Sequence, residues 1–354
     1  MRARRALLIV PFLLVSLLPA AVVAASPSGV PTLPDAAVQH RAAVLAYWTP
    51  ERMASAIPRN FVFDGARGGL EPQGKPAVKP TRPPKPTPTP TPSPSTDTLG
   101  APWNGGGIML TATGRVYFSM DGSNWICSGS VINDLKSGLS VVLTAGHCVV
   151  GNDGVFATYW MFIPSFDTSP TYTCAGTTYG CWVADALYAD AAFASTGSFN
   201  TTAVQHDWGF AVVTEGGLSG NAQLDSTVGS LPIEYGVKYA SQKMSAFGYP
   251  AAAPYTGNDL IYSRGTVGQD VLTFNTTWSL PSNLTGGASG GPWVQASDTT
   301  SYTDARAGSL NSYKYTYDKN HMYGPKFNSD TQTVFTAARD GTEPSGVVRE
   351  VFVP

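Results

Sequence analysis

Short runs of β-branched and aromatic residues dominate the chain after residue 98, and Gly, Ser, Asn, Asp or Pro separates one run from the next. This pattern is typical of half-buried strands joined by tight turns. The predicted strands are Arg115–Met120, Trp125–Ile132, Val141–Thr144, Thr158–Ile163, Trp208–Thr214, Lys243–Phe247, Leu260–Val267 and Val271–Phe274. No helical pattern lies between them, so the sequence predicts an all-β domain of antiparallel barrels or a sandwich over residues 98–354.

The N-terminus carries a different pattern. Met1 to Arg5 is basic, Ala6 to Leu18 is apolar, and Pro19 precedes the small residues 20–25. This order predicts a secretory signal peptide over residues 1–25, with cleavage after Ala24 or Ala25. A membrane anchor is the alternative, because the apolar stretch approaches the length needed to span a bilayer.

Residues 26–75 are mixed, and we expect them to form a pro-region or an N-terminal extension. A short helix is predicted over Ala36 to Tyr47, and a second begins with Thr49 as N-cap and Pro50 at the first helical position. Between Pro76 and Pro94, nine of nineteen residues are proline. Proline fixes φ and lacks an N–H, so residues 76–97 are predicted to be an extended linker that marks a domain boundary.

Composition narrows the function. A net charge of -2, with 13% charged residues, gives no electrostatic footprint for nucleic acid or an anionic membrane. Four cysteines suit an oxidising compartment and allow three disulfide pairings. Cys174 and Cys181 are close enough to close a small loop, which would leave Cys127 with Cys148. A zinc site is disfavoured because no C-x-x-C pair is present, and we expect no metal and no cofactor.

Three local contexts carry chemistry. His147 follows the apolar run 141–144 within Thr-Ala-Gly-His-Cys, where a histidine could act as base and acid. Asp207 opens the apolar run 208–213, and a buried carboxylate there needs a partner such as an imidazole N–H. Ser289 lies in Gly-Gly-Ala-Ser-Gly-Gly-Pro, where glycines allow a tight turn that points N–H groups inward. Taken alone, each context also fits a structural histidine, a turn aspartate or a flexible Gly-Ser loop.

The order of the three contexts decides between two hydrolase types. Gly287–Gly291 formally satisfies the G-x-S-x-G elbow of α/β-hydrolases, but those enzymes run Ser, acid, His along the chain. Here the order is His147, Asp207, Ser289, in a strand-rich context without parallel βα units. Both the order and the context argue against an α/β-hydrolase.

With Cys127-Ser128-Gly129-Ser130 upstream of the histidine, these motifs resemble the chymotrypsin-like serine proteases. The segment 244–250, ending in Gly-Tyr-Pro, resembles the secreted bacterial branch that includes glutamyl endopeptidases. The resemblance implies two six-stranded antiparallel β-barrels with the active site in the cleft between them. It also implies a Cys127–Cys148 bridge.

The resemblance assigns roles as well. His147 would be the general base, Asp207 its orienting acid and Ser289 the nucleophile, with the amides of Gly287 and Ser289 forming the oxyanion hole. Ser312 would be the serine near Asp207 on the strand that lines the substrate cleft.

Two positions depart from the trypsin-like pattern. Ala288 stands where animal members place the aspartate that pairs with a newly cut N-terminus, so activation by that ion pair cannot be carried over. Asn283 stands roughly where trypsin-like members keep the aspartate that selects Arg or Lys. The preferred substrate side chain therefore stays open.

The sequence predicts a secreted, monomeric serine endopeptidase, either free or retained at the cell wall, that acts on proteins or peptides. It predicts no partnership with nucleic acid, and none with membranes after signal cleavage. One rival is a secreted binding or adhesion protein that keeps the fold without turnover. Another is an esterase that uses the same three residues.

Because Ala288 cannot pair with an amino group, activity should not depend on one defined N-terminus. Chains that begin at Thr98, with and without two extra residues, are expected to hydrolyse a peptide substrate at rates within about twofold. A requirement for one particular N-terminus would contradict this expectation.

Overall fold

The computed structural model describes residues 33–64, 69–72, 96–166 and 172–353. The predicted signal peptide and most of the predicted linker lie outside these residues. Among the helices in the described ranges, none is long and apolar enough to cross a membrane.

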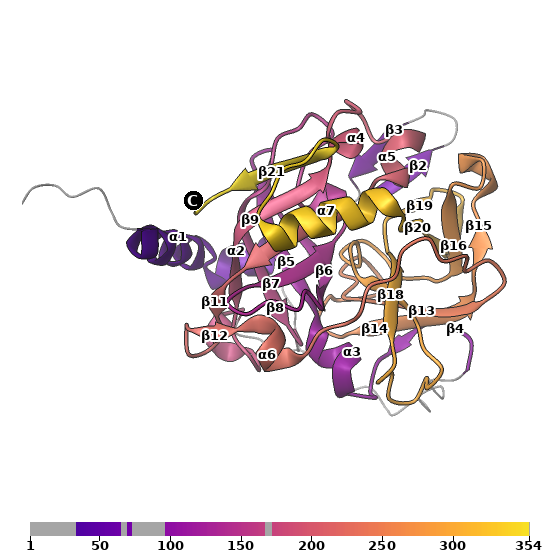
Figure 1. Ribbon diagram of the computed structural model, residues 1–354. Coiled ribbons are helices and arrows are strands. Elements are labelled where there is room, and N and C mark those ends of the chain that lie inside the picture. Colours follow the sequence, from indigo (N-terminus) through magenta and orange to yellow (C-terminus); the bar gives the residue numbers. More distant parts are fainter. Residues whose placement is uncertain (1–32, 65–68, 73–95, 167–171, 354) are drawn as a thin grey trace, which may run out of the picture.

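The first half of the strand-rich region closes into a barrel (Figure 1). Its strands run in the order β6-β5-β8-β9-β10-β7, and β6 also pairs with β7, so the sheet joins its own beginning. All of these ladders are antiparallel, and β21 adds to β9 from outside. The bounds are β5 Thr113–Met120, β6 Ser123–Ile132, β7 Ser140–Thr144, β8 Thr158–Pro164, β9 Trp182–Asp190, β10 Gly209–Val213 and β21 Val347–Val351.

The second half contains two further sheets, in the orders β18-β17-β13-β14-β4 and β15-β16-β20-β19-β2-β3. Together with the barrel they make the mostly-β double-barrel architecture that the sequence predicts. The bounds are β2 Phe61–Asp64, β3 Gly69–Pro72, β4 Thr98–Pro102, β13 Lys243–Gly248, β14 Ile261–Thr266, β15 Gly268–Gln269, β16 Thr277–Pro281, β17 Pro292–Gln295, β18 Arg306–Leu310, β19 Tyr313–Tyr315 and β20 Asp318–Pro325.

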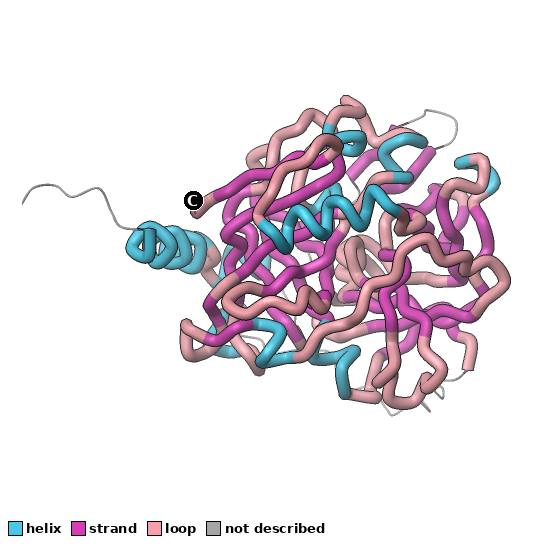
Figure 2. Tube along the Cα trace, in the orientation of Figure 1, coloured by secondary structure: helices cyan, strands magenta, loops and turns pink. Residues whose placement is uncertain are grey.

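The helices are short and lie outside the sheets (Figure 2). The α-helices are α1 Leu33–Tyr47, α2 Pro50–Ser55, α3 Gly107–Ala112, α4 Ala191–Ala194, α5 Thr201–Gln205, α6 Leu224–Val228 and α7 Ser329–Asp340. The 3₁₀ turns are η1 Gly146–Cys148, η2 Cys174–Gly176 and η3 Val271–Thr273, and the remaining short strands are β1 Ile57–Pro58, β11 Glu215–Gly216 and β12 Ala222–Gln223.

Most predicted elements are confirmed within one or two residues. Thr49 caps α2 as expected, its side chain accepting a hydrogen bond from the N–H of Arg52. The predicted strand Val271–Phe274 is wrong, because that segment forms η3. Its N-cap Asp270 accepts the N–H of Leu272, and Phe274 follows with a left-handed φ of 57°.

The N-terminal segment, residues 33–64, packs against both halves of the strand-rich region. Tyr47 of α1 stacks on Tyr159 with ring centroids 3.8 Å apart, and the indole of Trp48 donates to the Tyr159 carbonyl at 2.7 Å. Downstream, β1 pairs with β6 and β2 pairs with β19, each in parallel. Among the ladders between named strands in the described ranges, only these two are parallel.

Both predicted disulfides are present. Cys127–Cys148 ties β6 to η1 across 21 residues, and Cys174–Cys181 closes a loop of 7 residues. The first bridge is fully buried and fixes the backbone next to His147.

Replacing Cys127 and Cys148 together by Ser should lower the free energy of unfolding by about 3 kcal/mol, because the unfolded chain regains the entropy of a loop of this length. Chemical denaturation of the parent and the double variant measures the difference. A change below about 0.5 kcal/mol would show that the bridge does not constrain the unfolded chain.

Candidate active site

Asp207 and His147 meet where two connections of the first barrel lie side by side. His147 lies in η1, directly after β7, and Asp207 lies two residues before β10. Both side chains are fully buried, with Nδ1 of His147 2.8 Å from Oδ2 and 3.1 Å from Oδ1 of Asp207. The backbone N–H of His147 also donates to Oδ1 at 2.8 Å. The carboxylate therefore fixes both the ring and the turn that carries it.

Ser312 supplies a further donor to this carboxylate. It lies between β18 and β19, and its hydroxyl donates to Oδ2 of Asp207. A buried carboxylate without donors would be costly, and here three donors from two parts of the fold satisfy it. The resemblance placed Ser312 near Asp207, and the structure puts it in direct contact.

Ser289 lies in the turn before β17, where its neighbours are held by hydrogen bonds to the first barrel. The N–H of Ser128 donates to the Ser289 carbonyl at 2.7 Å, and the Ser128 hydroxyl donates to the Gly287 carbonyl at 2.8 Å. Gly287 has a φ of +96°, and a Cβ there would lie 3.0 Å from the Tyr249 carbonyl. Glycine is therefore required at this position.

The orientation of the Gly287 N–H follows from the preceding peptide. The Gly286 carbonyl accepts the N–H of Ala251 at 2.7 Å, so it faces the Ala251 loop. In a planar trans peptide the N–H points opposite to the C=O, so the Gly287 N–H faces away from that loop. No acceptor within the described residues takes this hydrogen.

The same argument holds for the Ser289 N–H. The Ala288 carbonyl accepts the side-chain amide of Asn311 at 3.0 Å and the N–H of Gly291 at 3.0 Å. The Ser289 N–H points the other way and also lacks an acceptor in the described part of the chain. Two donors of one loop therefore stand unused beside the serine, which is the arrangement that an oxyanion needs.

The hydroxyl of Ser289 does not bond to His147. It donates instead to the backbone carbonyl of Arg59 at 3.1 Å, although 230 residues separate the two in sequence. Phe61, two residues on, meets the His147 ring edge-on with centroids 4.6 Å apart. The buried Nε2 of His147 has no hydrogen-bond partner among the described residues. The N-terminal segment thus contacts both groups that would have to exchange a proton.

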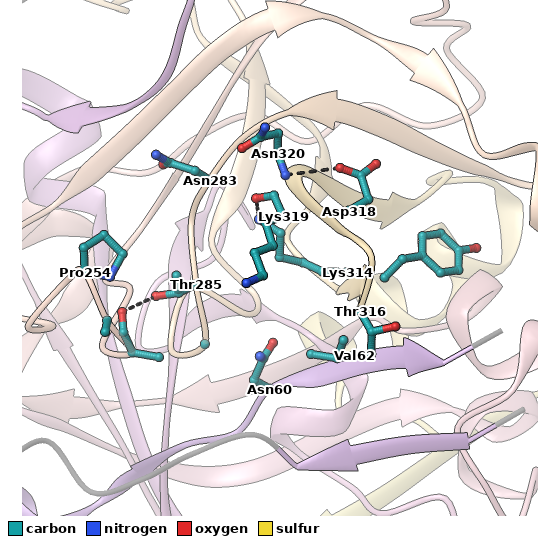
Figure 3. Close-up of a pocket in the computed structure, with 14 residues that line it drawn as sticks. Asn60, Val62, Pro254, Asn283, Thr285, Lys314, Thr316, Asp318, Lys319 and Asn320 are labelled. Carbon is teal, nitrogen blue, oxygen red and sulfur yellow. Dashed lines mark hydrogen bonds between the residues drawn. The ribbon is translucent and has the colours of Figure 1, made fainter. Parts of the chain in front are cut away.

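A pocket of about 560 Å³ opens beside the serine loop, lined by Thr285 and Gly286 of that loop (Figure 3). Asn60 lies on one side of it, across from Asn283 and Asn320. Asn283, which the sequence suggested as a substrate contact, lines this pocket and accepts the Tyr255 hydroxyl at 2.5 Å.

Lys314 also lines the pocket, and its ammonium is buried. It donates to the carbonyls of Ser282, Leu284 and Lys319 at 2.8–2.9 Å, which uses its three hydrogens. Burial lowers the pKa of Lys314 to about 8, and the nearby charge of Asp318 partly offsets this effect.

Other candidate groups do not join the site. Cys127, His147 and Cys148 lie together, but both sulfurs are in a disulfide and offer no thiolate to a metal. His206, next to Asp207 in sequence, is partly buried and pairs with Asp190 at 3.0 Å. His321 is partly exposed and pairs with Asp318 at 2.9 Å.

Sequence reasoning missed Arg59, Phe61 and Lys314. Arg59 and Phe61 reach the site only through the docking of the N-terminal segment. Lys314 carried a detectable signal, since a lysine two residues after Ser312 on a buried strand needs acceptors or a ligand.

Comparisons with known proteins place this fold among proteases. No protein-family profile matches the sequence, and no curated protein matches it significantly. The protease Anisep from Arthrobacter nicotinovorans is 31% identical, with a TM-score of 0.56, over 65% of this chain and 96% of its own. The thermostable serine protease AL20 from an extremophilic microorganism is 33% identical, with a TM-score of 0.55, over 66% of this chain and 99% of its own.

The buried ammonium of Lys314 should give stability a distinctive pH dependence. Its folded pKa of about 8 lies below the unfolded value, so between about pH 8 and 10.4 the unfolded chain binds more protons. The free energy of unfolding of the parent should therefore rise with pH relative to Lys314→Met, by up to about 3 kcal/mol.

Denaturant unfolding at pH 7, 8, 9 and 10 measures this difference. The matched control is Lys319→Met, which removes an exposed ammonium nearby. A constant difference between the parent and Lys314→Met across the series would contradict the prediction.

Proposed function

Because the chain belongs to the chymotrypsin-like serine protease family, we propose that it is a secreted serine endopeptidase that uses His147, Asp207 and Ser289. The observation that carries the proposal is the geometry of two loops, which hold the three side chains. One loop buries His147 on Asp207, and the other presents Ser289 beside two amides without acceptors.

Each group has one task in this proposal. With the cleft open, His147 takes the proton of Ser289 through Nε2 as the serine oxygen attacks a peptide carbonyl. Asp207 holds Nδ1–H, which leaves Nε2 as the basic nitrogen and stabilises the imidazolium that forms. Ser312 positions Asp207 by donating a hydrogen bond to its carboxylate.

The amides of Gly287 and Ser289 would receive the negative oxygen of the tetrahedral intermediate. Removing one such donor costs about 10²- to 10³-fold in turnover in other proteases. His147 then protonates the leaving amine, and water attacks the acyl group on Ser289 by the same route in reverse. No step needs a metal or an organic cofactor.

Several features favour a peptidase over the rivals. A binding protein on this fold would not need a buried Asp207–His147 pair together with a glycine at positive φ and unpaired amides. An esterase would use the same groups, so peptide substrates distinguish it. Two disulfides fit export into an oxidising compartment, which supports the predicted secretion.

Labelling with a serine-directed phosphonate tests the proposal. The reagent should bind the folded protein after cleavage in the linker followed by dilution, and Ser289→Ala should not be labelled. Hydrolysis of a peptide library should fall by about 10⁶-fold in that variant, as in other triad proteases. A folded parent that takes up no label after cleavage and dilution would overturn the proposed activity, and labelling without peptide hydrolysis would favour an esterase.

A further inference from the structure

The cleft that the proposed function requires already holds a piece of the same chain. Residues 57–62 lie across the site: Ile57 and Pro58 pair with β6, and Phe61 begins the pairing with β19. Between the two ladders, Arg59 reaches Ser289 and Asn60 lines the pocket. From Pro58 to Val62 every residue is at least nine-tenths buried.

The segment does not lie as a substrate would. A peptide ready for attack presents its carbonyl carbon to the serine oxygen and its carbonyl oxygen to the two amides. Here the oxygen of the Arg59 carbonyl faces Ser289, at 3.1 Å, and accepts its hydrogen. The amides of Gly287 and Ser289 take no part in the contact. The bond that follows Arg59 is therefore held in an unreactive orientation.

The contact also disables the base. A serine hydroxyl has one hydrogen, and giving it to Arg59 withdraws it from His147. Phe61 packs on the His147 ring, and the Phe61 and Phe199 rings stack with their centroids 4.2 Å apart. These two aromatic side chains cover the His147 ring. Water and substrate are both kept from Nε2.

The segment is anchored on both sides of the serine. The N–H of Arg59 donates to the Ile126 carbonyl at 3.0 Å, and its guanidinium lies 5.2 Å from the Trp125 ring and 3.4 Å from Asp121. Upstream, Met53 of α2 is buried. These contacts are independent of the linker, so cutting the linker alone would leave the segment in place until it dissociates.

The site beneath the segment is otherwise assembled. Asp207 already holds His147, and the two amides already point away from their loop. Ala288, buried in the core, offers no charge for a new N-terminus. Removing the segment therefore needs no rearrangement of the catalytic loops.

We propose that residues 57–64 are a built-in inhibitor that binds the active-site cleft in a non-productive orientation, and that their release switches the enzyme on. This inference rests on the proposed function and names its regulation. The ligand class is an extended peptide that places an aromatic ring on His147 and a backbone carbonyl on Ser289.

The test uses the full chain with a recognition sequence for a specific protease inserted between Pro76 and Pro94. Phosphonate labelling is followed before cleavage and after cleavage with dilution. We expect labelling to be at least about 100-fold faster after cleavage, because the tether no longer supplies a high local concentration of the segment. Ser289→Ala, cleaved in the same way, should not be labelled.

A variant separates docking from cleavage. Phe61→Ala in the uncleaved chain should speed labelling by about 10- to 100-fold, because a buried aromatic anchor is lost. The matched control Leu45→Ala removes a partly exposed side chain from α1 of the same N-terminal region and should leave the rate unchanged.

A synthetic peptide of residues 33–64 completes the test. Added to the cleaved, diluted enzyme, it should restore inhibition and keep its mass. Hydrolysis between Arg59 and Asn60 would overturn the non-productive orientation. Equal labelling before and after cleavage would overturn the inference and leave the proposed function intact. No labelling in either folded state would overturn both.

Discussion

The buried carboxylate of Asp207 is the constraint on which the site depends. A charge at this depth is tolerated only if donors surround it, and its donors come from η1 and from the strand connection that carries Ser312. The need to satisfy one anion therefore fixes the imidazole and ties the two halves of the fold together at their boundary. The Cys127–Cys148 bridge holds the same turn from the other side.

The loop that carries Ser289 shows the opposite arrangement, because two of its backbone N–H groups have no hydrogen-bond acceptor among the described residues. The side chains of Ser128 and Asn311 donate to the carbonyls of Gly287 and Ala288, so these carbonyls are satisfied while the N–H groups of Gly287 and Ser289 have no acceptor among the described residues. Unpaired polar groups beside a pocket cost stability, and they persist where function requires them. In this structure the N-terminal segment covers the loop without bonding to these donors. The cleft is therefore blocked, but its two N–H groups stay free to bind an oxyanion.

The sequence predicted what depends on local pattern. Strand alternation identified most of the barrel, and three short motifs in order identified His147, Asp207 and Ser289, of which the structure places the first two in direct contact. It failed where tertiary contacts override the pattern: β9 was missed because the buried Asp185 interrupts its apolar run. Helix α7 was predictable from two residues that were overlooked, its N-cap Asn328 and Gly341 directly after its last residue. Arg59 could not be assigned, because its contact with Ser289 depends on docking across the whole fold.

A crystal structure of the phosphonate adduct, obtained after release of the N-terminal segment, tests the central claim most directly. The account predicts phosphorus bonded to Oγ of Ser289, a phosphoryl oxygen within hydrogen-bonding distance of the Gly287 and Ser289 amides, and no chain across His147. An adduct on another residue, or an oxygen turned away from both amides, would contradict it.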